Sequence, residues 1–190
     1  MYAILHEGNA KKTADNELLK LLIKSLGFEE EKIDFFGMGT KSNFFKSSND
    51  KYKVLLSEIQ EDTITKILFI TDADYESNDH VYGGFENTQN ELNKIIEELD
   101  IKNISDIYVT RNPLTNDGYL ESLVLSSIPE EQKNCIQNFL DCSEFSTKEN
   151  HKAILNQIYK IAYPNAPFDF NHKNFDELKQ KITKLFKKEE

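Results

Sequence analysis

Three carboxylates stand where the sequence predicts that short apolar strands end. Glu7 closes a predicted strand at 2–7, and Asp72 and Asp74 close the most apolar strand of the chain, at 66–74. Residues two apart in an extended segment project to the same side, so the two aspartates can face one cation. Hard cations such as Mg²⁺ and Mn²⁺ prefer oxygen ligands. These side chains therefore predict a metal site, in which Glu7 binds the ion or transfers a proton.

Each of these carboxylates also has a purely structural interpretation. Asp72 and Asp74 could form a solvated turn whose side chains cap the segment that follows. Glu7 could lie at the start of a helix, where the helix dipole favours negative charge. Carboxylates directly after so apolar a strand lose hydration, which costs free energy unless a positively charged partner compensates. This cost favours a bound metal ion.

Between the second predicted strand and the next helix lies a glycine turn, Gly-Met-Gly-Thr-Lys at 37–41. Lys41 follows the glycines of this turn and could reach a phosphate group, so Gly39 and Lys41 are candidates for binding substrate. The lysines and aromatic residues that continue to position 53 resemble a strip that tracks a phosphate backbone. For most of that strip we favour a solvated loop whose aromatic side chains pack on the core.

Strands and helices alternate along the first 128 residues. After the first strand, further strands are predicted at 32–37, 66–74 and 106–110, and helices at 13–26, 52–61 and 86–99. A helical or mixed segment begins at residue 120. This order predicts an α/β domain with a mostly parallel sheet flanked by helices. Such sheets bind ligands at the carboxyl ends of their strands, where the three acids lie.

Beyond residue 128 the pattern is helical. Helices are expected at 129–141, 147–162 and 174–188, with a loop at 163–172. We therefore divide the chain into an α/β domain, 1–128, and a helical C-terminal extension, 129–190, that packs on the same domain. Cys135 and Cys142 could face the same side of the first of these helices, where they are expected to be buried apolar residues.

Composition excludes several classes of protein. The chain has 190 residues and a formal net charge of −10, which argues against a general nucleic-acid coat but leaves room for a local basic strip. No apolar run approaches the roughly 20 residues that span a bilayer, and no signal peptide is visible. The two cysteines have no partners at zinc spacing. These features predict a reduced, cytoplasmic protein without a membrane partner.

Two segments, Ile-Leu-His-Glu-Gly at 4–8 and Ile-Leu-Phe-Ile-Thr-Asp-Ala-Asp at 67–74, carry a resemblance to a known family. They resemble the Toprim domain, the metal-dependent module of topoisomerases, bacterial primases and overcoming-lysogenization-defect (OLD) type nucleases. The wider pattern resembles a Toprim-related bacterial family of unknown function, with 37–41 after the second strand and Gly-Tyr-Leu-Glu-Ser-Leu at 118–123 after the last. The resemblance covers residues 1–128 well and the tail loosely.

The resemblance implies a Toprim-like Rossmannoid fold and chemistry on phosphodiester bonds of DNA or RNA. Asp72 and Asp74 would bind Mg²⁺ or Mn²⁺, Glu7 would be a ligand or the general acid/base, and Glu121 is a candidate for a second metal site. One departure is plain: OLD-type nucleases often carry a second acid about a turn after the glutamate, whereas this chain has Asn-Ala-Lys-Lys at 9–12.

Three functions follow from these observations. The first is a nuclease dependent on Mg²⁺ or Mn²⁺, which could form a homodimer or depend on an ATPase partner protein in a defence or toxin-like system. The second is a non-catalytic Toprim-fold subunit that binds or regulates within an ATPase-containing complex, as the missing second acid favours. The third is a doubly wound signalling domain, which would need a lysine at the end of the strand 106–110 that is not there.

Overall fold

The computed structural model describes residues 1–8, 14–143, 159–162 and 168–187. Its described strands form one four-stranded sheet in the order β2-β1-β3-β4, and every pair of neighbours is parallel. The strands are β1 (Tyr2–His6), β2 (Ile33–Gly37), β3 (Lys66–Asp72) and β4 (Ser105–Thr110). The parallel α/β sheet predicted from the sequence is thereby confirmed, although β3 ends at residue 72 rather than 74.

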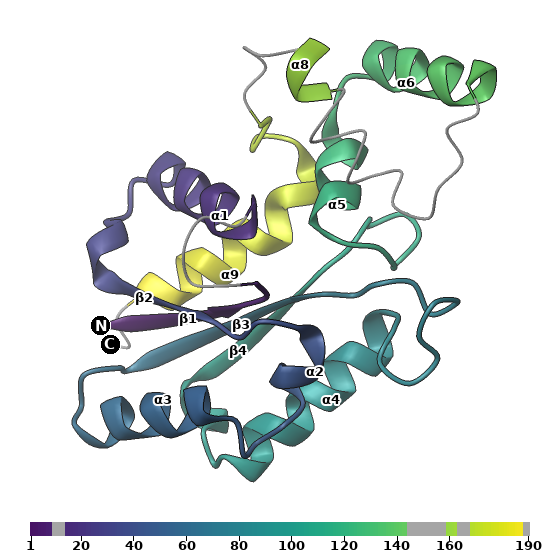
Figure 1. Cartoon of the computed structure of the whole chain (residues 1–190). Coiled ribbons are helices and arrows are strands. Elements are labelled where there is room, and N and C mark those ends of the chain that lie inside the picture. Colours follow the sequence, from purple (N-terminus) through teal and green to yellow (C-terminus); the bar gives the residue numbers. More distant parts are fainter. Residues whose placement is uncertain (9–13, 144–158, 163–167, 188–190) are drawn as a thin grey trace.

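Helices cover both faces of this sheet (Figure 1). One face carries α1 (Ala14–Ser25), α5 (Leu120–Ser127) and α9 (Asp176–Phe186), and the other carries α2 (Lys41–Phe44), α3 (Asp50–Gln60) and α4 (Phe85–Glu98). The remaining described helices are α6 (Glu130–Cys142) and α8 (Lys160–Ala162), with single 3₁₀ turns η1 (Glu30–Lys32), η2 (Lys102–Ile104) and η4 (Lys173–Phe175).

Alternation along the strands divides the core into two clusters, one on each face of the sheet. Ile4 and Leu68 point to the face that α1, α5 and α9 cover, whereas Leu5 and Phe69 point to the face that α2, α3 and α4 cover. Both faces of β1 and β3 are therefore buried, which explains why residues 3–5 and 67–70 are apolar at every position.

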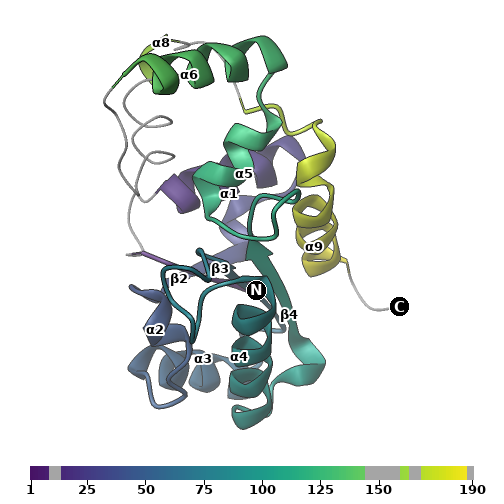
Figure 2. The same ribbon diagram turned by 90° about the vertical axis from the view of Figure 1, so that its right-hand side faces the viewer.

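The C-terminal region packs in two different ways. Leu178, Ile182 and Leu185 of α9 are buried in the same cluster as Ile4 and Leu68, so this helix is part of the main core. By contrast, α6 has no buried residue and lies apart from the sheet (Figure 2). The division of the chain at residue 128 stays a prediction.

Several sequence-based expectations change in detail. The segment expected to be only a turn at 37–41 leads into the short helix α2, which begins at Lys41. Cys135 and Cys142, which were expected to be buried, are free and exposed, because α6 places no residue in the core. Most of the helix expected at 147–162 and half of the loop at 163–172 lie outside the described residues. Among the described helices, none has the length and apolar character needed to cross a bilayer.

Candidate functional site

The site forms where β1 and β3 end side by side. His6 pairs with Ile70 in the parallel register, so Glu7 continues beside Thr71 at the carboxyl edge of the sheet. One carboxylate oxygen of Glu7, Oε1, accepts a hydrogen bond from the backbone N–H of Asp72 at 2.9 Å and another from the hydroxyl of Thr71. The register thus brings Glu7 and Asp72, two of the predicted site residues, together.

Glu7 holds its proton more tightly than an ordinary glutamate. Burial raises the pKa of its carboxyl and the charge of Asp74 adds to the rise, while the bonds from Thr71 and Asp72 and the charge of Lys41 oppose it. The net direction is upward. A carboxyl with a raised pKa can hold and release a proton closer to neutral pH, as a general acid or base must.

Asp72 ends β3 and connects it to helix α5. Its Oδ1 accepts a hydrogen bond from the backbone N–H of Leu120, the first residue of that helix, at 3.1 Å. The Asp72 side chain therefore contacts the first turn of α5, whereas the structural interpretation of the sequence expected it to cap the segment directly after the strand. Glu121 is the next residue of α5 and is only 7% exposed, so the structure places it in the first turn of the helix that Asp72 contacts.

Asp74 leaves the extended conformation of the strand. Its φ is 57°, in the left-handed region that few residues other than glycine adopt. Its backbone exchanges two hydrogen bonds with Gly118, from Asp74 N to Gly118 O at 2.7 Å and from Gly118 N to Asp74 O at 3.1 Å. The expectation of extended backbone through residue 74 is therefore wrong, and strand alternation gives no reason to place Asp72 and Asp74 on one side.

Lys41, the first residue of α2, extends its side chain to the end of β3. Gly8 and Gly39 exchange backbone hydrogen bonds of 2.6 and 2.9 Å, which fix the turn that precedes α2. Lys41 then directs its ammonium to the carbonyl oxygen of Ala73 at 2.7 Å and to Oδ2 of Asp74 at 3.2 Å, with a side chain only 10% exposed. The N–H of Gly39 is used by Gly8, so in this arrangement Gly39 positions Lys41.

The donor chemistry fits a hard divalent cation. Glu7, Asp72 and Asp74 supply carboxylate oxygens, which Mg²⁺ and Mn²⁺ prefer, and Asp74 already holds a cation in the Lys41 ammonium. As the side chains stand in the described part of the chain, no three His, Cys, Asp or Glu residues lie close enough together to form a ligand set. Asp72 and Asp74 are the residues that would hold an ion, with water and phosphate completing its coordination.

An aromatic pair connects the segment after α2 to the loop before α4. Phe45, directly after α2, and Tyr82, in the loop between β3 and α4, pack with ring centroids 4.9 Å apart and planes tilted by 33°. Phe44 and Tyr52 of the same region are fully buried. The aromatic residues of the strip therefore pack mainly inward, as we favoured from the sequence.

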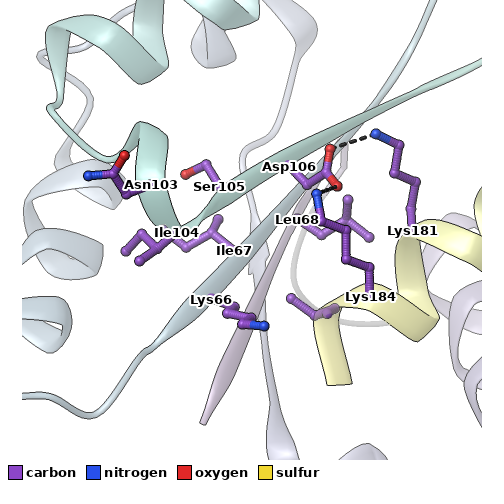
Figure 3. Close-up of a pocket in the computed structure, with 10 residues that line it drawn as sticks. Lys66, Ile67, Leu68, Asn103, Ile104, Ser105, Asp106, Lys181 and Lys184 are labelled. Carbon is purple, nitrogen blue, oxygen red and sulfur yellow. Dashed lines mark hydrogen bonds and ion pairs between the residues drawn. The ribbon is translucent and has the colours of Figure 1, made fainter. Parts of the chain in front are cut away.

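A small cavity of about 60 Å³ lies at the opposite edge of the sheet, and its lining includes Lys66, Lys181 and Lys184 beside apolar and neutral residues and Asp106 (Figure 3). Asp106 at the start of β4 binds Lys181 at 2.6 Å and Lys184 at 2.9 Å, both from α9. Lys66 donates to the carbonyl oxygen of Lys187 at 2.6 Å. All three ammonium groups thus have oxygen partners, and these contacts hold α9 against the sheet.

Sequence reasoning missed Thr71 and Gly118. The signal for Thr71 was its place two residues after Phe69 on the same face of β3, which a known register would have set beside Glu7. Gly118 was seen only as part of a motif, not as the partner of Asp74. Asp15, the nearest acid after Glu7, lies in α1, and its side chain is outside the described part.

Comparisons of the whole chain with protein-family models, with curated proteins and with solved structures found no match.

Proposed function

We propose that this chain carries out metal-dependent phosphodiester chemistry on DNA or RNA, as a nuclease of Toprim-like fold. The observation that carries the proposal is the convergence of Glu7, Asp72 and the Lys41–Asp74 pair at the carboxyl edge of β1 and β3. In parallel α/β sheets this edge is where ligands bind. The resemblance of residues 1–128 to the Toprim family supports the same chemistry.

Each residue of the site has a separate chemical role in this proposal. Glu7, with its raised pKa, accepts a proton from the attacking water or donates one to the leaving oxygen. Lys41 offers an ammonium to a phosphate oxygen, and Asp72 and Asp74 hold Mg²⁺ or Mn²⁺, with Glu121 as a candidate for a second site. The bound ion would supply Lewis-acid stabilisation of the phosphoryl group.

A second candidate function rests on the Lys41–Asp74 ion pair. Because an ammonium already neutralises Asp74, the site could be complete without an ion. The chain would then be a non-catalytic binding or regulatory subunit of an ATPase-containing complex. Under either function, DNA or RNA, an ATPase partner and a second copy of the chain remain proposed partners.

The test is a cleavage assay on labelled single-stranded DNA, double-stranded DNA and RNA, with Mn²⁺, Mg²⁺ or a chelator. We expect cleavage that requires metal and falls at least about a hundredfold in Glu7→Gln, the usual scale for losing an acid/base group. Asp72→Asn and Asp74→Asn should also lose activity. Glu97→Gln, on the exposed face of α4, is the matched control and should cleave normally.

Metal binding is measured separately, because cleavage also needs the right substrate or partner. In a thermal melt, Mn²⁺ at 100 times its dissociation constant should add about 2.7 kcal/mol to the free energy of unfolding. The shift should vanish in Asp72→Asn/Asp74→Asn. Cleavage that survives in all three site variants would contradict the nuclease, and a wild-type protein that neither melts higher with Mn²⁺ nor cleaves would favour the binding subunit.

A further inference from the structure

We infer that Thr71 is a positioning residue for Glu7, holding one oxygen of its carboxylate in place so that the other is presented to the ligand. The inference deepens the proposed function and rests on it for the reaction. The two hydrogen bonds to Glu7 can be tested in the protein without metal or substrate. We call the two donors to Glu7 Oε1, the Thr71 hydroxyl and the Asp72 backbone N–H, the Glu7 clamp.

Both donors of the clamp come from successive residues of one buried strand. Thr71 is 2% exposed and pairs with Val109 of β4, so its backbone lies inside the sheet. A β-branched side chain in a strand has few allowed χ1 rotamers, which limits where its hydroxyl can point. The hydroxyl and the amide of Asp72 therefore approach Glu7 from a rigid base, and neither can follow the carboxylate if it moves.

Both donors of the clamp bind the same carboxylate oxygen of Glu7. Both hydrogen bonds go to Oε1 of Glu7, and Oε2 accepts none from the described residues. Hydrogen bonds to an ionised carboxylate are among the stronger ones, and two of them fix both the rotamer and the plane of the group. A mobile glutamate loses considerable rotamer entropy when it is fixed for ligand binding or reaction. Because the clamp fixes the Glu7 side chain in the folded protein, this cost does not oppose a proton transfer or a ligand contact at Oε2.

Two substitutions separate the hydroxyl from the shape of the side chain. Thr71→Val keeps the branched volume and removes the donor, while Thr71→Ser keeps the donor and removes the methyl group. Ser105→Ala is the matched control, because the Ser105 hydroxyl of β4 is buried and has no hydrogen-bond partner among the described residues. We expect Thr71→Val alone to affect Glu7.

The first measurement is made without metal or substrate. NMR relaxation of the Glu7 side-chain carbons should report a rigid group in wild type, Thr71→Ser and Ser105→Ala, and a mobile one in Thr71→Val. In wild type the Thr71 hydroxyl proton should also exchange slowly with water, and this protection should disappear in Glu7→Ala. That second measurement decides the question if Thr71→Val does not fold.

The second measurement is the cleavage rate. Thr71→Val should lower kcat about tenfold, equivalent to about 1.4 kcal/mol, with KM nearly unchanged, and Thr71→Ser should recover most of kcat. A Glu7 side chain equally rigid in Thr71→Val and wild type overturns the positioning role, as does an equal loss of kcat in the valine and serine variants. A further outcome is a Glu7 side chain that is rigid in the wild type and mobile in Thr71→Val, in a protein that cleaves no substrate and binds no Mn²⁺. That result would support the positioning role of Thr71 and contradict the proposed nuclease.

Discussion

The ammonium of Lys41 lies 3.2 Å from Oδ2 of Asp74, so a carboxylate that the sequence assigns to a metal ion is already paired with a cation of the chain. The same ammonium donates to the carbonyl oxygen of Ala73 at 2.7 Å, which ties helix α2 to the end of β3. A divalent ion at Asp74 would have to compete with this contact. Lys41 therefore links the state of the carboxylate to the position of α2.

Replacing Lys41 should change stability and metal affinity in opposite directions. We expect Lys41→Met to lower the free energy of unfolding by about 1–2 kcal/mol, because Ala73 O and Asp74 lose a charged donor. Mn²⁺ should bind about threefold to fivefold more tightly, since a part-exposed ion pair is worth up to about 1 kcal/mol. Urea unfolding and calorimetric titration measure the two effects. Lys53→Met, in an exposed pair with Asp50, is the control, and unchanged Mn²⁺ affinity in Lys41→Met would rule out competition.

Gly118, which forms the bridge to Asp74, has a backbone conformation and a close neighbour that predict that only glycine is tolerated there. Gly118 has φ of 92°, and a Cβ there would lie 2.5 Å from Oγ and 2.8 Å from Cβ of Ser122. Gly118→Ala should therefore lose about 2–3 kcal/mol of stability, through backbone strain and this clash together.

Gly27→Ala provides the comparison for that variant. Gly27 has φ of 78°, but apart from its own chain neighbours no atom of the described residues lies within 4 Å of the added Cβ. Its alanine variant therefore carries the backbone strain alone, about 1 kcal/mol. Equal losses for the two alanine variants in urea unfolding would show that the contact with Ser122 has no effect.

Glu7 should make the protein less stable as pH rises. Because burial raises its pKa in the folded state, the folded protein binds more protons than the unfolded chain between the ordinary and the raised pKa. The contribution of Glu7 to the free energy of unfolding is therefore fully present below its ordinary pKa and is lost as pH rises through its raised pKa. Urea unfolding from about pH 4 to about pH 8 should show this fall in wild type and a flatter curve in Glu7→Gln. An equal slope in both proteins would assign the pH dependence to another group.

Asp106 should have the opposite pH dependence. Burial alone would raise the pKa of its carboxyl, but the bonds from Lys181 and Lys184 outweigh it and hold the pKa below the usual value. Its stabilisation is present at neutral pH and is lost as pH falls through the lowered value. Asp106→Asn should cost about 1 kcal/mol at neutral pH, a value discounted because Lys184 is mostly exposed. Mn²⁺ binding should not change, since Asp106 lies at the other edge of the sheet.

The sheet could be predicted because burial on both faces leaves a direct mark in the sequence. The run Ile67–Ile70 is apolar at every position, and only a strand covered by helices on both sides requires that. The same logic placed Glu7 and Asp72 at one edge. The exposed cysteines of α6 were predicted wrongly, because helical spacing shows which residues share a face but not whether another element covers it.

The contacts within the site could not be predicted in the same way. Thr71 binds Glu7 because of the register between β1 and β3, and Asp74 leaves the extended conformation with a left-handed φ. Register depends on the packing of the whole sheet. The left-handed residue is an aspartate rather than a glycine, so composition gave no sign of it.

The position of α9 also bears on how the chain emerges from the ribosome. The face of the sheet covered by α2, α3 and α4 is complete once residue 110 has been made, whereas the other face needs Leu178, Ile182 and Leu185. Until those residues appear, Ile4 and Leu68 lack part of their cover. Contacts over such separations form slowly and leave apolar surface open to aggregation. A nascent chain halted before α9 is therefore the form of this protein most in need of a chaperone.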